Sequence, residues 1–188
     1  DMESFPKSAL ARVEEMTKAA AADPARAVSF QGAPGANSHL AALEVDPDCL
    51  PVPCFSFEDA IDAVKEGRAA RAVIPIENSL HGRVADIHFL LPESGLSIIG
   101  EHFMRIRHCL MAKHADAKLT TAMSHPQALG QCRHYLRANG ITPIAYADTA
   151  AAAAFVADSD DEGAACVAPP IAAGIYGLEM MQEGIGDD

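Results

Sequence analysis

The sequence contains no tryptophan, few aromatic residues and little positive charge. Across 188 residues, aromatic side chains account for 5 % and hydrophobic residues for 49 %. The core must therefore be built mainly from Ala, Val, Ile and Leu. Lys and Arg number 14 against 26 Asp and Glu, which gives a formal net charge of −12. Nucleic acids and anionic membranes both attract basic surfaces, so we expect neither as a partner.

Paired cysteines and long apolar runs are also missing. The five cysteines are scattered without a C-x-x-C pair, and the eight histidines form no H-E-x-x-H motif or Cys/His pairing. We therefore expect reduced thiols, no disulfide framework and no metal site. No apolar run is long enough to span a membrane, and no basic-then-apolar signal opens the chain. These features predict a cytoplasmic protein.

Short apolar strands alternate with helices along most of the chain. Residues 1–26 predict a helical leader, with an amphipathic helix over 8–22. Two runs of strand–helix units follow, separated by a stretch at 96–113 with strand character. This order predicts an α/β fold of two lobes around a cleft, lobe 1 over about 27–101 and lobe 2 over about 102–178, with an incomplete C-terminal return. The expected strands are 27–31, 50–55, 71–75, 120–123, 142–147 and 164–167, and the main helices begin near 38, 57, 83, 126, 149 and 170.

Four strand-to-helix junctions carry small hydroxyl or amide side chains. They follow the strands that end near residues 31, 75, 123 and 147. Helix N-termini present free backbone N–H groups, and the carboxyl ends of strands in open α/β sheets bind ligands. The junctions therefore predict a small, oxygen-rich anionic ligand held by neutral donors. Taken singly, Ser38, Ser124 and Thr149 are more simply explained as helix caps. Glu77 could be a surface acid, although the turn around it needs no carboxylate, which favours a functional role.

Motifs for other chemistry are absent. The GAPG loop at 32–35 lacks the Lys-Ser/Thr of a phosphate-binding P-loop, and no G-x-G-x-x-G or G-x-S-x-G occurs. We therefore expect neither a nucleotide cofactor nor a hydrolase serine.

Several motifs taken together resemble the prephenate dehydratase family. They are FQGAPGANS (30–38), PIENS (75–79) followed by Gly82, SHPQALGQC (124–132), DTAAAAAF (148–155), GIYGL (174–178) and the closing GIGDD. The resemblance covers about residues 27–188. It implies a fold like that of type II periplasmic binding proteins and a lyase of phenylalanine biosynthesis that converts prephenate to phenylpyruvate with loss of water and carbon dioxide. It implies no cofactor, a small dicarboxylate substrate and a homo-oligomer, and arogenate is the alternative substrate.

The resemblance also implies roles for individual residues. Asn78, Ser124 and Gln131 would be catalytic. Gln131 follows Ser124 by seven residues, which would place the two on one face of a helix. The residues that would shape the site and bind the substrate carboxylates are Ser38, Glu77, Ser79, His125 and Thr149.

The chain departs from the family pattern in three places. A Thr-Arg-Phe segment, whose Thr is regarded as catalytic and whose Arg suits a substrate carboxylate, is expected after GIGDD and lies outside these residues, as does the regulatory ACT domain. Ala36 and Asn37 replace the usual Thr and aromatic residue. Either the native protein continues past Asp188 or this is a naturally shortened homologue. We expect the 188-residue chain alone to be inactive, and a non-catalytic two-lobed sensor of a small carboxylate is the rival function.

Overall fold

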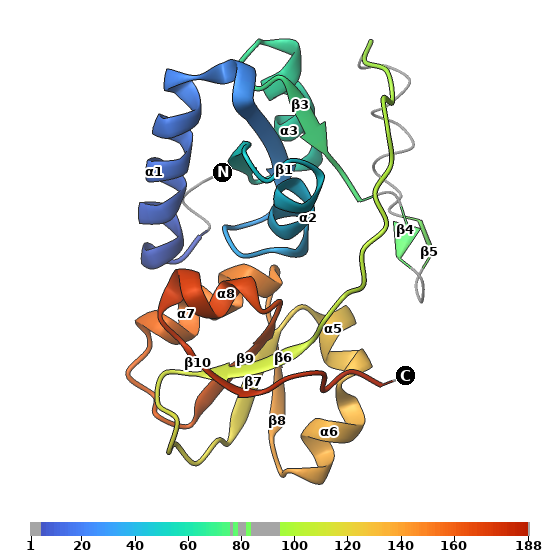
Figure 1. Ribbon diagram of the computed structural model, residues 1–188. Helices are drawn as coiled ribbons and strands as arrows, with labels where there is room; N and C mark the ends of the chain where they lie inside the picture. Colours follow the sequence, from blue (N-terminus) through green and yellow to red (C-terminus); the bar gives the residue numbers. More distant parts are fainter. Residues whose placement is uncertain (1–4, 76, 79–81, 84–94, 188) are drawn as a thin grey trace. The chain divides into compact units, whose positions relative to one another are not determined.

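The computed structural model describes residues 5–75, 77–78, 82–83 and 95–187, and the chain divides into two compact units (Figure 1). Unit 1 consists of Asp1–Arg12, Ala33–Asn37 and Arg105–Asp188, and unit 2 consists of Val13–Gly32 and Ser38–Met104. The predicted lobe boundary near residue 101 lies close to the last crossing between units, after Met104. The predicted leader is divided between the units within helix α1 (Lys7–Ala22).

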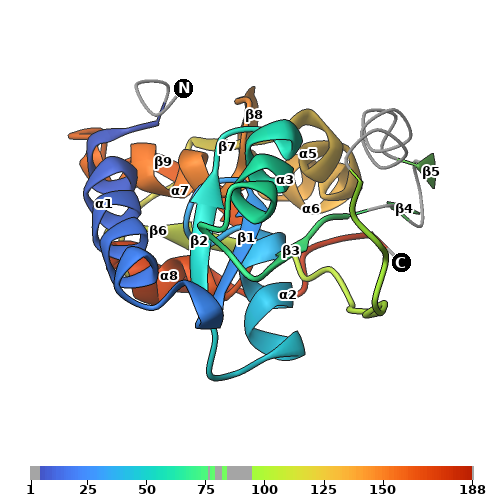
Figure 2. The same ribbon diagram turned by 90° about the horizontal axis from the view of Figure 1, so that it is seen from above.

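Unit 2 is built on a small parallel sheet. Strand β1 (Ala27–Gln31) lies between β2 (Leu50–Cys54) and β3 (Arg71–Val73), as Figure 2 shows. Helix α2 (Asn37–Val45) joins β1 to β2, and α3 (Phe57–Lys65) joins β2 to β3. Because these right-handed connections run in opposite directions across the sheet, α2 and α3 cover opposite faces.

The packing of β1 follows from its alternating side chains. Ala27 packs with the α3 side of the sheet, whereas Val28 packs with Ala42 of α2. Phe30 also points to the α2 face, where its ring stacks on His39 with centroids 5.2 Å apart. Both faces of this strand are buried, which explains its nearly continuous apolar sequence.

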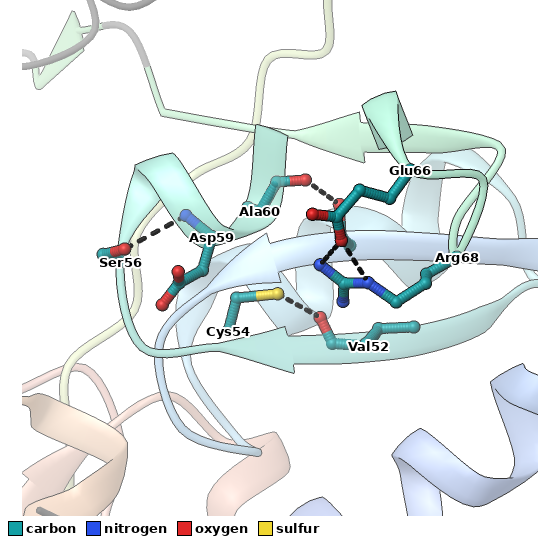
Figure 3. Close-up of polar contacts among 8 residues, drawn as sticks. Val52, Cys54, Ser56, Asp59, Ala60, Glu66 and Arg68 are labelled. Atoms are coloured by element: carbon teal, nitrogen blue, oxygen red, sulfur yellow. Dashed lines mark hydrogen bonds and ion pairs between the residues drawn. The ribbon is translucent and has the colours of Figure 1, made fainter. Parts of the chain in front are cut away.

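The ends of α3 are fixed by local sequence. Ser56 Oγ accepts a hydrogen bond from the Asp59 backbone N–H at 3.1 Å, as the S-x-x-[DE] pattern predicts (Figure 3). The helix stops before Gly67, which adopts a left-handed conformation with φ of 77°. Arg68 then pairs with Glu66 at 2.8 Å on the exposed surface.

Unit 1 is built on a mixed sheet. Strands β7 (Thr121–Ser124), β8 (Thr142–Ala145) and β9 (Ala164–Ala168) are parallel, while β6 (Cys109–Ala112) and β10 (Glu179–Gln182) complete the order β10-β6-β9-β7-β8. The three parallel strands lie side by side in the order β8-β7-β9, so the first of them along the chain is the central one. Unit 2 has the same arrangement, β2-β1-β3, although the sequence contains no tandem repeat.

Successive side chains along the strands of unit 1 point to opposite faces of the sheet, so the unit has a hydrophobic core on each face. Leu110 and Val167 pack on the face covered by α5 (Pro126–Gln131) and α6 (Arg133–Ala138). Met111 and Cys166 pack on the opposite face with α7 (Thr149–Asp158) and α8 (Ile171–Tyr176). Alanine supplies much of α7, whose residues 150–154 are all buried. The small side chains allow the helix to approach the sheet closely.

Several sequence expectations need correction. The single helix expected to begin near 126 is two helices, Pro126–Gln131 and Arg133–Ala138, that meet at Cys132, where φ and ψ are −109° and 8°. Within the described part of 96–113, only β6 forms a strand, because residues 95–108 lack a ladder partner. Residues 179–182 form β10, so a closing strand is present although the sequence analysis did not predict one.

Two further elements lie in the segment after β3. Glu77–Asn78 (β4) and Gly82–Arg83 (β5) form a short antiparallel pair. Arg83, the expected first residue of a helix, therefore lies in a strand, and the remainder of that expected helix is outside the described residues. The structure also contains a 3₁₀ helix at Pro24–Arg26 (η2), directly after α1.

Candidate active site

The carboxyl ends of the parallel strands in unit 1 form one edge of its sheet. At this edge β7 is followed by α5 on one face, and β9 is followed by α8 on the other. Adjacent strands whose connections leave toward opposite faces create a crevice, which is where open α/β sheets bind ligands. The predicted residues Ser124, His125 and Thr149 all lie at this edge, and Gln131 is on the helix that follows β7.

Ser124 is fully buried. It is the last residue of β7, and its Oγ donates a 2.7 Å hydrogen bond to the carbonyl of Val167 in β9. It therefore does not cap α5, which begins two residues later. It also does not share a helix face with Gln131, so the two-turn spacing argument is wrong. The hydroxyl is held at the junction of β7 and β9 by the neighbouring strand.

His125 performs the capping that sequence analysis considered for Ser124. Its Nδ1 accepts a hydrogen bond from the Gln127 backbone N–H at 3.1 Å at the start of α5. Because Nδ1 is an acceptor, the proton of the neutral imidazole is on Nε2. The partly buried ring can therefore donate a hydrogen bond from Nε2 to an oxygen ligand.

Gln131, at the end of α5, is bound to a histidine that comes from another part of unit 1. Its Oε1 lies 2.5 Å from Nε2 of His108, the residue directly before β6. Both side chains are partly buried. The backbone of the closing GIGDD segment reaches both residues: Ile185 N–H donates to the His108 carbonyl at 3.0 Å, and Asp187 N–H donates to the Gln131 carbonyl at 2.6 Å.

Thr149 is the first residue of α7, and the capping residue is its neighbour Asp148. One Asp148 oxygen accepts from the Ala151 N–H at 2.9 Å, and the other accepts from the Ala33 N–H at 3.2 Å. The carboxylate occupies the helix N-terminus that an anionic ligand would otherwise approach. It joins α7 to the loop at 33–37, which belongs to the same unit.

A second contact holds the 33–37 loop against α8. Tyr176 Oη donates to the Pro34 carbonyl at 2.5 Å, and burial, followed by the charge of Asp148, raises the pKa of Tyr176 well above its usual range. Gly35 adopts φ of 97°, and a Cβ there would lie 3.2 Å from Ala172. The first motif of the family pattern is thus fastened to the last two helices of unit 1.

The remaining predicted residues belong to unit 2. Ser38 lies in the first turn of α2 and is partly buried. Glu77 and Asn78 form β4, with backbone partners Arg83 and Gly82. Ser79 lies outside the described residues. Ser38 follows β1 and the 77–78 strand follows β3, and β1 and β3 are neighbours in the sheet of unit 2.

The described side chains offer little redox or metal chemistry. All five cysteines are free and buried. Burial raises the pKa of Cys54 to about 11 and those of Cys132 and Cys166 to about 12, so these thiols stay protonated at neutral pH. Among the described residues no group of three His, Cys, Asp or Glu side chains is placed to hold a metal ion. No described helix is both long and apolar enough to cross a membrane.

Sequence reasoning missed His108 and gave Asp148 no role. His108 lies 23 residues from Gln131, and no local spacing joins the two. Asp148 stands directly before a helix, so its capping role could have been predicted from the sequence. Its second bond, to Ala33, depends on the tertiary structure.

Fold and site together define a protein with two α/β units and polar, mostly uncharged side chains at the carboxyl ends of its strands. The fold and the site alone do not specify a family, but the profile of the prephenate dehydratase family matches residues 28–188. The chain belongs to the prephenate dehydratase family.

Relatives of this chain include bacterial and plant proteins. It is 42 % identical over 166 residues to a bifunctional N-acyl-homoserine lactone acylase/prephenate dehydratase of Komagataeibacter europaeus, covering 86 % of this chain and 58 % of that protein. It is 44 % identical over 165 residues to arogenate dehydratase/prephenate dehydratase 6 of Arabidopsis thaliana, a chloroplastic protein, covering 86 % and 40 %.

A solved structure supports the fold. Prephenate dehydratase from Arthrobacter aurescens, in complex with L-Phe, has a TM-score of 0.77 and 28 % identity, covering 86 % of this chain and 56 % of that one. The family's periplasmic-binding-protein-like fold agrees with the fold expected from the sequence. The chain spans roughly half the length of these relatives.

Proposed function

We propose that this chain forms the dehydratase part of an enzyme that converts prephenate to phenylpyruvate, water and carbon dioxide. The observation that carries the proposal is the set of uncharged polar side chains at the carboxyl edge of unit 1. Ser124, His125 and Gln131 lie there on one strand–helix segment, in a chain of the prephenate dehydratase family.

The reaction requires positioning and one proton. A proton is delivered to the ring hydroxyl, which leaves as water. The ring carboxylate leaves as carbon dioxide, and its electron pair remains in the ring as the C–O bond breaks. The product is aromatic, so the enzyme needs only to orient a dicarboxylate and supply a proton donor. No electron is exchanged with an external oxidant or reductant.

The predicted residues suit these tasks by their chemistry. Hydroxyl, amide and neutral imidazole groups bind carboxylates through N–H and O–H donors without neutralising them. The buried position of Ser124 and the held amide of Gln131 provide preorganised groups, which act more strongly than mobile groups on developing charge. In this proposal Asn78, Ser124 and Gln131 act at the reacting ring, Ser38, Ser79, His125 and Thr149 shape the site and hold the carboxylates, and Glu77 shapes the site.

Substrate choice is tested by competition. Arogenate differs from prephenate by an amine, and relatives of this chain are named for either or both substrates. The full-length protein should be given both substrates together, and phenylpyruvate and phenylalanine should be quantified separately. Predominant phenylalanine formation would assign arogenate as the preferred substrate.

The decisive experiment is turnover by the full-length protein. We expect phenylpyruvate from prephenate, and no turnover by the 188-residue chain alone. Absence of product from either substrate with the full-length protein would reject the proposed reaction. Saturable binding of prephenate without turnover would instead support the rival two-lobed sensor.

We also propose that the protein acts as a homo-oligomer in a reducing compartment such as the cytoplasm. Family resemblance supports the oligomer, and the five free, buried thiols support the reducing setting. Light scattering of the purified protein and localisation of the tagged protein in its host test the two statements.

A further inference from the structure

The contact between His108 and Gln131 joins two elements that no sequence motif connects. His108 precedes β6, whereas Gln131 ends α5, and the distance between His108 Nε2 and Gln131 Oε1 is 2.5 Å. An amide oxygen only accepts hydrogen bonds, so the ring Nε2 is the donor. This pairing holds for the Nε2–H tautomer and for the imidazolium alike.

The closing segment fixes the imidazole in place. Gly186 packs so closely on the ring that a Cβ at this position would lie 2.9 Å from His108 Cδ2. Ile185 anchors the segment, because its side chain is only 4 % exposed in the core beside Leu110. In Figure 1 the chain after β10 runs past β6 toward α5 and α6, which agrees with the bonds of residues 185 and 187 to His108 and Gln131.

The bond determines which end of the Gln131 amide is available. With Oε1 occupied by His108, the amide NH₂ group, which carries two donors, remains for an oxygen ligand. If the amide rotated by half a turn, its oxygen would face the ligand and repel a carboxylate. A donor at position 108 therefore selects the orientation in which Gln131 can bind an anionic substrate.

We propose that His108 is a positioning residue that orients the Gln131 amide toward the substrate, and that the 185–187 segment holds the imidazole for this purpose. The inference rests on the proposed function, since it assigns His108 a role through a predicted catalytic residue. His108 itself needs no contact with the substrate.

The test is a double-mutant cycle in the full-length protein. His108→Phe keeps a ring but removes the donor, and His108→Gln restores an N–H donor. Each is made in the wild-type and Gln131→Ala backgrounds, and kcat and KM for prephenate are measured with the thermal midpoint. His114→Phe is the matched control, since His114 is exposed on the loop after β6.

We expect His108→Phe to lower kcat/KM about 10- to 100-fold, because the Gln131 amide then loses its hydrogen bond to the charged substrate carboxylate. His108→Gln should recover most of this loss. In the Gln131→Ala background His108→Phe should have no further effect, since the two residues act as one unit. His114→Phe should leave kcat/KM unchanged. Gly186→Ala, which presses on the ring, should lower kcat/KM in the same direction as His108→Phe.

Three outcomes would overturn the inference. These are equal losses from His108→Phe in both backgrounds, a loss no larger than that of His114→Phe, and no recovery in His108→Gln. If His108→Phe fails to fold, Gly186→Ala is made in the wild-type and Gln131→Ala backgrounds instead; a loss that vanishes in the Gln131→Ala background supports the inference, and equal losses in both backgrounds overturn it. Lack of product from the wild-type protein with either substrate would remove the proposed function as well, so the two failures are distinguishable.

Discussion

The chain contains two buried serines whose comparison can distinguish a structural role from a catalytic one. Ser29 in β1 and Ser124 in β7 are both 0 % exposed. Each Oγ donates a 2.7 Å hydrogen bond to a backbone carbonyl, that of Ala60 for Ser29 and that of Val167 for Ser124. Only Ser124 belongs to the predicted site. Ser29→Ala is therefore a matched control for Ser124→Ala.

The two substitutions should destabilise the protein to a similar extent. Removing a buried hydroxyl that satisfies a carbonyl costs about 1–3 kcal/mol. For a chain of this size, each kcal/mol lowers the thermal midpoint by about 2–4 °C, so both variants should unfold roughly 2–12 °C earlier than the wild type. With a total stability of about 5–15 kcal/mol, both proteins stay almost entirely folded at 25 °C.

Their activities should differ sharply. Removing one preorganised polar group from a reacting centre costs about 10²- to 10³-fold in kcat, so Ser124→Ala should lose at least about 100-fold in kcat while Ser29→Ala stays near the wild type. The assay is phenylpyruvate formation by the full-length variants, with thermal unfolding followed in parallel. A Ser124→Ala variant whose kcat lies within about threefold of Ser29→Ala would refute the catalytic role of Ser124.

Three further predictions concern stability. Asp148→Ala should lose both the cap of α7 and the bond to the 33–37 loop, at a cost of about 2 kcal/mol, whereas Asp148→Asn should lose less because Asn also caps helices; denaturant unfolding of both variants compares them, and equal losses would contradict the account. Leu136→Ala should cost about 2–5 kcal/mol, because Leu136 is 2 % exposed and its removal leaves a cavity in unit 1; the unfolding midpoint measures this, and a loss below about 1 kcal/mol would argue against tight packing there. Burial raises the pKa of Cys132 and Cys166 from 9.0 to about 12, so the folded state retains these protons where the unfolded state loses them. Stability from this source should be complete below about pH 9 and fall as the pH rises from 9 toward 12. The thermal midpoint of the wild type is compared with that of a variant in which both cysteines are replaced by Ala, and an equal pH dependence of the two midpoints in that window would refute it.

Much of the fold could be predicted because its signals are local. Strands such as 27–31 and 164–168 are short apolar runs between turn residues, and the α3 start at Ser56 is a capping pattern. Helix breaks and strand ends were harder, since they depend on neighbours. Cys132 interrupts a helix that has good apolar spacing, and β10 is a strand because β6 offers it an edge.

The predicted site divides in the same way. The residue types and their places follow from the sequence, which predicted Ser124, His125 and Thr149 at strand-to-helix junctions and Gln131 on the helix after the third junction; their roles at the site stay predictions. The contacts of these residues were not found. Ser124 reaches Val167 across the sheet, and His125 rather than Ser124 caps α5.

The sequence by itself determined the α/β class, the polar strand ends and the family, because these depend on composition, periodicity and ordered motifs. It also determined the acidic surface and the scarcity of aromatic side chains. Only the tertiary structure decided that His108 meets Gln131 and that the closing Gly186 lies over the imidazole. Such pairs are set by the strand order β10-β6-β9-β7-β8, which brings together segments distant along the chain. No local spacing records that order, because it results from the packing of the whole unit.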